Sequence, residues 1–220
     1  MFDIAIIENK IGYTFKDKSL VTTAFTHVSF SVYSYEKLEF LGDSVLSLVV
    51  SEYLYEKYPN FDQGELTKAR AQVVDKPPLK QVILSLGIEK YIMLGAGEKQ
   101  NHLEKSDKLC GDLFEALLGA IYLDGGYANA KKFVLSGLEK TINEVVKNKD
   151  DLTDFKSKLF ELCQKKRIEK HFLYEKTGED HNPIFTAILY LDGKEVSRAK
   201  GTSKKKAEQT ACQIALKTLD

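Results

Sequence analysis

The sequence is poor in cysteine and proline and has no long hydrophobic run. Its three cysteines are widely spaced and fit neither a zinc motif nor a disulfide set, so we interpret them as small core residues in a reducing cytosol. No apolar stretch approaches the roughly 20 residues that cross a bilayer. The first ten residues also lack the basic region of a signal peptide. We therefore expect a globular cytoplasmic protein without a membrane partner.

The chain also has no net charge, because its 32 Lys and Arg residues balance its 32 Asp and Glu residues. A neutral chain argues against nucleic-acid binding, but the charge is unevenly distributed. Residues 151–220 hold 14 basic and 11 acidic residues, which leaves 18 basic and 21 acidic residues for 1–150. The basic part suits contacts with phosphates of a nucleic acid, and the acidic part suits a metal site.

The hydrophobic pattern changes once along the chain. From Ile4 to about Lys147 apolar residues recur at helical spacing, which predicts a helical domain over 1–147, with a polar loop at 98–108. Residues 148–151 are polar and predict a linker. Over 152–220 the pattern predicts a helix (155–164), three strands (172–177, 184–191 and 195–199) joined in part by an Asp-Gly turn, and a closing helix (204–219).

Five acidic residues lie within two of the apolar helical segments. In the first segment Glu36, Glu39 and Asp43 are separated by three and four residues. In the second segment Asp112 and Glu115 are three residues apart. Residues three, four and seven apart project from the same face of a helix. Each segment should therefore present a row of carboxylates from a largely buried helix.

Buried carboxylates repel one another unless a cation lies among them. No basic residue is interleaved on these two faces, so a hard divalent cation is the economical partner, and all-oxygen ligands suit Mg²⁺ or Mn²⁺. The alternative is that such residues form an ordinary solvated helix face. Two sets, each inside an apolar run, favour the metal site.

Residues 36–46 (Glu-Lys-Leu-Glu-Phe-Leu-Gly-Asp-Ser-Val-Leu) closely resemble the signature stretch of bacterial ribonuclease III. Residues 12–15, 26–30, 111–116 and 124–126 resemble further segments of that family in the right order. Residues 203–209 resemble the basic helix start of a double-stranded-RNA-binding domain. The resemblance covers nearly the whole chain. It implies a multidomain protein, with an all-α ribonuclease III endonuclease domain followed by a small α+β (α-β-β-β-α) double-stranded-RNA-binding domain.

The resemblance also implies roles for individual residues. Glu39, Asp43, Asp112 and Glu115 match the metal-binding set, and Asp43 and Glu115 match the residues named catalytic. Glu36 resembles an outer acid of the same cluster. Phe40 matches a residue that packs into the partner subunit of a homodimer. Mg²⁺, for which Mn²⁺ substitutes, is the implied cofactor, and no small-molecule cofactor or nucleophilic side chain is expected.

Three regions of the second domain are expected to contact duplex RNA. Lys204, Lys205 and Lys206 follow a helix N-cap at Thr202 or Ser203, where a phosphate could sit. His181, in the loop 178–181, matches a minor-groove contact of the family. Gln164 matches a polar residue that faces the other minor groove.

The chain departs from the family pattern at several positions. Gln63 replaces an outer acid, for which we expect Glu65 to compensate. Phe160 replaces a common Gln, and Lys108 replaces a common Ser. His27 matches a family segment, and we interpret it as a buried structural residue.

Three functions are considered. The leading hypothesis is a Mg²⁺-dependent endonuclease that hydrolyses double-stranded RNA to 5′-phosphate and 3′-hydroxyl products, processing ribosomal RNA precursors and structured transcripts. The second is a non-catalytic duplex-RNA-binding protein with a structural nuclease-like domain. A di-iron helical protein would need Glu-x-x-His pairs on facing helices, and the sequence contains none.

Overall fold

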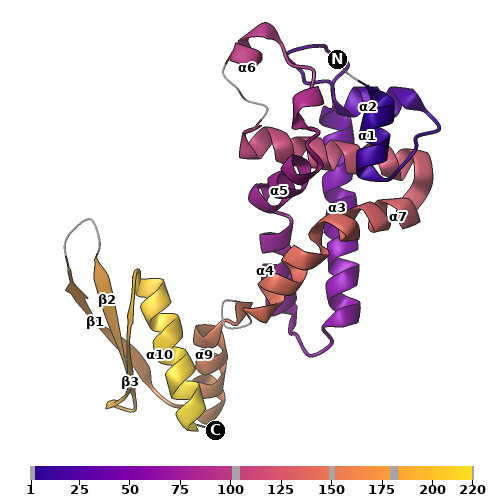
Figure 1. Ribbon diagram of the computed structural model, residues 1–220. Coiled ribbons are helices and arrows are strands. Elements are labelled where there is room, and N and C mark those ends of the chain that lie inside the picture. Colours follow the sequence, from indigo (N-terminus) through magenta and orange to yellow (C-terminus); the bar gives the residue numbers. More distant parts are fainter. Residues whose placement is uncertain (1–2, 101–104, 149–151, 179–182, 220) are drawn as a thin grey trace. The chain divides into compact units, whose positions relative to one another are not determined.

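The chain divides into two compact units, residues 1–152 and 153–220. The computed structural model, drawn in Figure 1, describes residues 3–100, 105–148, 152–178 and 183–219. The predicted linker, 148–151, therefore lies outside the described residues except for Asn148. Each unit is considered by itself below.

The first unit is helical throughout its described elements, as predicted. These elements are α1 (Ile4–Ile11), α2 (Lys18–Ala24), α3 (Glu36–Lys57), α4 (Gln63–Val73), α5 (Lys76–Leu86), the 3-10 turn η1 (Glu89–Tyr91), α6 (Ala96–Gln100) and α7 (Asp107–Lys147). The predicted loop at 98–108 is only partly correct, because α6 and the first residues of α7 occupy the described ends of that segment.

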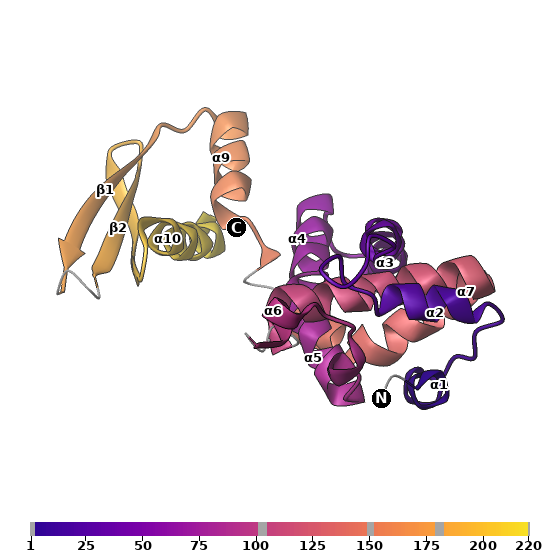
Figure 2. The same ribbon diagram turned by 90° about the horizontal axis from the view of Figure 1, so that it is seen from above.

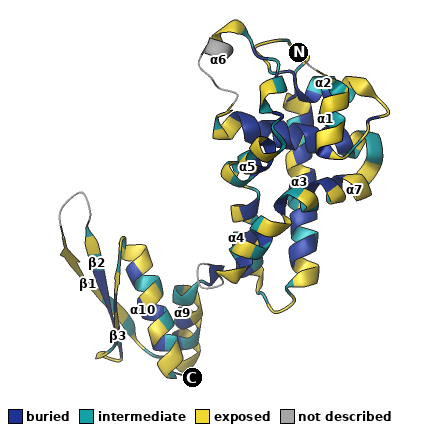
Figure 3. Ribbon diagram, viewed as in Figure 1, coloured by how far each residue is buried: buried dark blue, intermediate teal, exposed yellow. Residues whose placement is uncertain are grey.

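Helices α3 and α7 form the centre of this unit, and α5 packs on α7. Figure 3 shows buried residues concentrated along both central helices. From Leu109 to Ile121 every residue of α7 is buried, including Phe114, Leu117 and Leu118 at 0% exposure. Removing this much apolar surface from water holds the helices together, because each fully buried aliphatic or aromatic side chain contributes about 1.5–3 kcal/mol.

Local signals in the sequence set where the helices begin and bend. The Asp62 carboxylate accepts the Glu65 N–H, and the Glu65 carboxylate accepts the Asp62 N–H, which forms a capping box at the start of α4. Pro77 and Pro78 lie in the first turn of α5, where a missing N–H costs little. Gly126 bends α7 at φ 75°, a conformation that strongly favours glycine. Helix α7 therefore continues beyond Gly125-Gly126 with a kink.

The second unit confirms the predicted order of elements. It contains α9 (Phe155–Lys166), β1 (Lys170–Thr177), β2 (Ile184–Leu191), β3 (Lys194–Gly201) and α10 (Lys204–Leu219). The antiparallel sheet has the order β1-β2-β3. Asp192 and Gly193 both have positive φ, 47° and 75°, as the predicted tight hairpin turn requires.

Both helices of this unit lie on one face of the sheet (Figures 1 and 2). A small core fills the space between these layers, and its residues include Leu159, Cys163, Leu189, Ala207 and Cys212. All three cysteines of the chain are buried, in agreement with their interpretation as core residues. Among the helices that the structure describes, none has the length and apolar character needed to cross a membrane.

Candidate metal centre and RNA-binding surface

Two glycines allow α3 and α7 to touch through their backbones. A Cβ atom added at Gly42 would lie 1.8 Å from the Glu115 carbonyl oxygen, and one at Gly119 would lie 2.2 Å from the Leu38 carbonyl oxygen. Neither position can accept a side chain without separating the helices. This close approach brings the acidic residues of α3 next to those of α7.

Three carboxylates meet at this contact. Glu39, Asp112 and Glu115 each offer an oxygen, and these oxygens all lie within 4.8 Å of one another. Asp112 and Glu115 are 3% and 4% exposed, whereas Glu39 is half-buried. An all-oxygen, largely desolvated set of this kind matches the ligand chemistry that Mg²⁺ and Mn²⁺ prefer.

A lysine also reaches this group, which the sequence analysis did not foresee. Lys76, the first residue of α5, places its Nζ 2.7 Å from Asp112 Oδ1 and 2.7 Å from Glu115 Oε2. The two acidic helices carry no basic residue among these carboxylates, but a cation reaches them from a third helix, α5. A divalent metal is therefore not the only partner available to the buried carboxylates. The single positive charge of Lys76 does not balance the negative charge of the three carboxylates.

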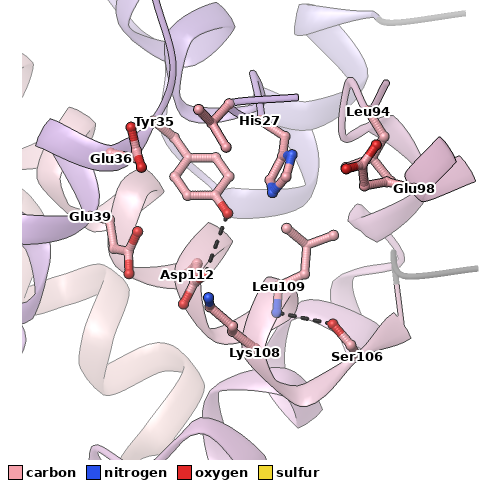
Figure 4. Close-up of a pocket in the computed structure, with 11 residues that line it drawn as sticks. His27, Tyr35, Glu36, Glu39, Leu94, Glu98, Ser106, Lys108, Leu109 and Asp112 are labelled. Carbon is pink, nitrogen blue, oxygen red and sulfur yellow. Dashed lines mark hydrogen bonds between the residues drawn. The ribbon is translucent and has the colours of Figure 1, made fainter. Parts of the chain in front are cut away.

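The surroundings shift the protonation of these groups. Burial, followed by the negative charge of Asp112, raises the pKa of Glu39 to about 7, although Lys76 opposes this shift. Burial also raises the pKa of Glu115, against the opposing effect of Lys76. The Tyr35 hydroxyl donates to Asp112 Oδ2 at 3.4 Å and so helps to orient that carboxylate (Figure 4).

The remaining predicted acids lie at the edge of the group. Asp43 and Glu36 are exposed rather than desolvated, and Asp43 brings no oxygen into the compact set of three. Both line an open cavity of about 480 Å³ that Glu115 and Lys76 also line. The negative charge of Asp43 still acts at short range, because it contributes to the raised pKa of Glu115.

A second cavity, of about 580 Å³, is lined by Tyr35, Asp112 and Lys108 together with Glu36 and Glu39, which line both cavities (Figure 4). His27 is another of its lining residues. Its imidazole was expected to be buried, but it is half-buried and its Nδ1 lies 2.7 Å from the Ser29 hydroxyl.

Glu65 does not take the place of the missing acid at Gln63. It is 2% exposed, and its carboxylate accepts the Asp62 N–H at 3.0 Å in the capping box of α4. The expected compensation is therefore wrong, because this carboxylate is already used to begin a helix.

Large apolar side chains are exposed near the start of α3. Phe40 is 78% exposed, and Val32 and Tyr33 are 88% and 84% exposed. Such a concentration on a monomer is typical of a protein–protein contact. Phe40 as a dimer contact stays a prediction.

The predicted RNA contacts of the second unit lie in three places. Lys204, Lys205 and Lys206 are exposed at the start of α10, where the Lys206 N–H donates to the Ser203 hydroxyl at 3.2 Å. Gln164 is exposed in the last turn of α9. His181 lies outside the described residues.

Phe160 occupies the expected place of a glutamine on α9. Its ring lies beside Phe172, and the Nζ atoms of Lys156 and Lys170 lie 5.6 Å and 4.7 Å from its centroid. Cations within about 6 Å of an aromatic ring are attracted to its face. This position therefore offers an aromatic surface with adjacent positive charge instead of an amide.

Both units match known families. A family model described as "Ribonuclease-III-like" matches residues 17–142, and one described as "Double-stranded RNA binding motif" matches residues 155–219. The chain is 39% identical to Ribonuclease 3 of Protochlamydia amoebophila, over 97% of this chain and 91% of that protein. It is 37% identical to Ribonuclease 3 of Aliarcobacter butzleri, over 100% of this chain and 99% of that protein.

A solved structure resembles the first unit. The nuclease domain of ribonuclease III from Campylobacter jejuni, described for flexibility in a region involved in dimer formation, aligns with a TM-score of 0.61 and 39% identity. The alignment covers 63% of this chain and 97% of that domain. Since two modules match in the same order and the similarity to relatives spans almost all of each chain, this chain belongs to the ribonuclease III family.

Proposed function

We propose that this protein is a Mg²⁺-dependent endoribonuclease that hydrolyses double-stranded RNA to 5′-phosphate and 3′-hydroxyl products. The observation that carries the proposal is the meeting of three carboxylates from two helices beside an open cavity. Ribosomal RNA precursors and structured transcripts in the cytoplasm are the proposed substrates. Mn²⁺ is proposed to substitute for Mg²⁺.

Each acidic residue has a proposed role in this reaction. Glu39, Asp43, Asp112 and Glu115 would hold the metal, and Asp43 and Glu115 are the proposed catalytic residues. A bound divalent metal supplies an activated water and neutralises charge on the phosphate. Glu36, exposed at the rim of both cavities, is proposed to orient water or substrate. The cavity next to Glu115 leaves room for a phosphate to approach.

The second unit is proposed to supply affinity for the duplex. Lys204, Lys205 and Lys206 stand at a capped helix start, where backbone N–H groups and ammonium groups favour a phosphate. Gln164 and His181 are proposed as minor-groove contacts. The exposed Phe40 is proposed to seat in a second copy of the chain, so that two sites act on opposite strands of the RNA.

One observation favours a second candidate, a duplex-RNA-binding protein without catalysis. Lys76 already pairs with both buried carboxylates of α7, and a permanent ammonium at this point would replace a metal. The two candidates differ in whether Mg²⁺ can enter the site.

Cleavage of a long, fully paired RNA separates these candidates. We expect the intact protein to cut in Mg²⁺ or Mn²⁺ and not in EDTA, and Glu115→Gln to bind the duplex in a gel-shift assay without cutting it. Glu144→Gln, on the exposed surface of the same helix, is the matched control and should cut normally. Binding of duplex without cleavage in either metal would refute the nuclease proposal and support the second candidate.

A further inference from the structure

The Lys76 ammonium lies within hydrogen-bonding distance of both buried carboxylates of α7. Its Nζ is 2.7 Å from Asp112 Oδ1 and 2.7 Å from Glu115 Oε2. Asp112 and Glu115 are also two of the three residues whose oxygens form the compact group. The ammonium and a metal ion bound by the same oxygens would therefore compete for one place.

The position of this lysine is built into the fold. A Cβ atom at Gly111 would lie 2.2 Å from Lys76 Cδ, so the glycine leaves the space that the lysine stem occupies. Asp75 accepts the Lys76 N–H at 2.8 Å, which fixes the start of α5. The Lys76 side chain is 34% exposed, so it can leave toward the adjoining cavity that it lines.

The charges at the site favour replacement of the ammonium by a divalent ion. Lys76 contributes one positive charge to a group of three carboxylates, whereas a divalent ion contributes two. A dication and an ammonium on the same oxygens repel each other strongly in a site of low polarity. A metal bound to the two oxygens that Lys76 contacts, Asp112 Oδ1 and Glu115 Oε2, therefore requires that both Lys76 ion pairs break.

We propose that Lys76 is an internal counter-cation of the Asp112–Glu115 pair, which a divalent metal must displace. Lys76 stabilises the metal-free protein and weakens metal binding, and it thereby sets the metal concentration at which the site fills. This inference rests on the proposed function, because it takes the acidic group to be the metal site.

Metal titration of the intact chain without RNA tests the proposal. Isothermal titration calorimetry with MgCl₂ and MnCl₂ should show Lys76→Met binding metal about tenfold or more tightly than the wild type, since two charge-assisted hydrogen bonds no longer compete. In EDTA the same variant should unfold at a lower temperature, because two buried carboxylates lose their cation. Lys80→Met removes another α5–α7 ion pair, with Asp107, and should leave metal affinity unchanged.

A second variant keeps the charge and moves the lysine. Gly111→Ala places a methyl group where the Lys76 stem lies, so it should also tighten metal binding. Equal or weaker metal affinity in Lys76→Met, with duplex cleavage intact in the wild type, would overturn this inference alone. A wild type that binds metal but never cuts duplex would overturn the proposed function and leave the inference standing. A wild type that binds neither Mg²⁺ nor Mn²⁺ would overturn both.

Discussion

Replacing Gly42 with alanine should separate the two helices that carry the acidic residues. The added Cβ would lie 1.8 Å from the Glu115 carbonyl oxygen, and real Cβ atoms essentially never approach another heavy atom closer than 3.0 Å. The backbones must therefore move apart by at least 1.2 Å, the difference between these distances. The clashing oxygen belongs to the backbone of a buried helix, so no side-chain rotation can relieve the clash.

This displacement should affect both stability and activity. Overpacking of a close-packed core lowers the free energy of unfolding by about 1–3 kcal/mol. We expect a clash with a backbone atom to cost an amount near the upper end of this range. For a protein of this size about 3 kcal/mol lowers the melting temperature by roughly 6–12 °C. Glu39 would also move away from Asp112 and Glu115, and a misplacement of about 1 Å can slow a reaction about 100-fold.

Thermal unfolding and single-turnover cleavage of duplex RNA measure these two effects. Gly97→Ala is the matched control, because a Cβ at that position has no neighbour within 4 Å. This control should behave like the wild type in both assays. If Gly42→Ala melted within about 1 °C of the wild type and cut RNA at the same rate, the close helix approach could not be what positions the acidic residues.

Two further predictions concern charge. The Glu39 carboxyl has a pKa of about 7 in the folded protein, against an ordinary value of 4.5. The stabilisation that protonated Glu39 gives the metal-free protein is therefore fully present below pH 4.5 and is lost as the pH rises through 7. In EDTA, Glu39→Gln should therefore melt higher than the wild type at pH 8 but not at about pH 4.5, and a melting difference independent of pH would contradict this assignment. Replacing Lys204, Lys205 and Lys206 together by alanine should weaken duplex binding and flatten its salt dependence, by about 0.9 in slope for each phosphate that is no longer neutralised. Filter binding from about 50 to 300 mM salt would measure this effect, and an unchanged slope would show that these exposed lysines do not bind phosphates.

Much of the fold follows from local rules that the sequence displays. Helical spacing places Asp112 and Glu115 on one face of α7, and the structure brings both into one group. The Asp192-Gly193 turn and a helix cap at Thr202 or Ser203 were predictable because only short stretches of chain decide them, and the structure places Ser203 at the cap. The order of elements in the second unit follows from the same kind of pattern.

The distances between elements followed from none of these rules. Periodicity assigned Glu39 and Asp43 to one face, yet only Glu39 joins the group of three, because the approach of α7 selects which acids become close. The sequence also predicted that Glu65 would replace the acid that is missing at Gln63. Its carboxylate instead accepts the Asp62 N–H at the start of α4.

Spacing and composition along the chain predicted most of the helices and strands and the residue types that could bind metal and RNA, because these patterns act within one element. The tertiary structure alone places Lys76, 36 residues before Asp112, on the acidic pair. It also explained Gly42 and Gly119 as the points where two backbones touch. These features depend on the packing of different helices, which brings together residues that no local pattern connects.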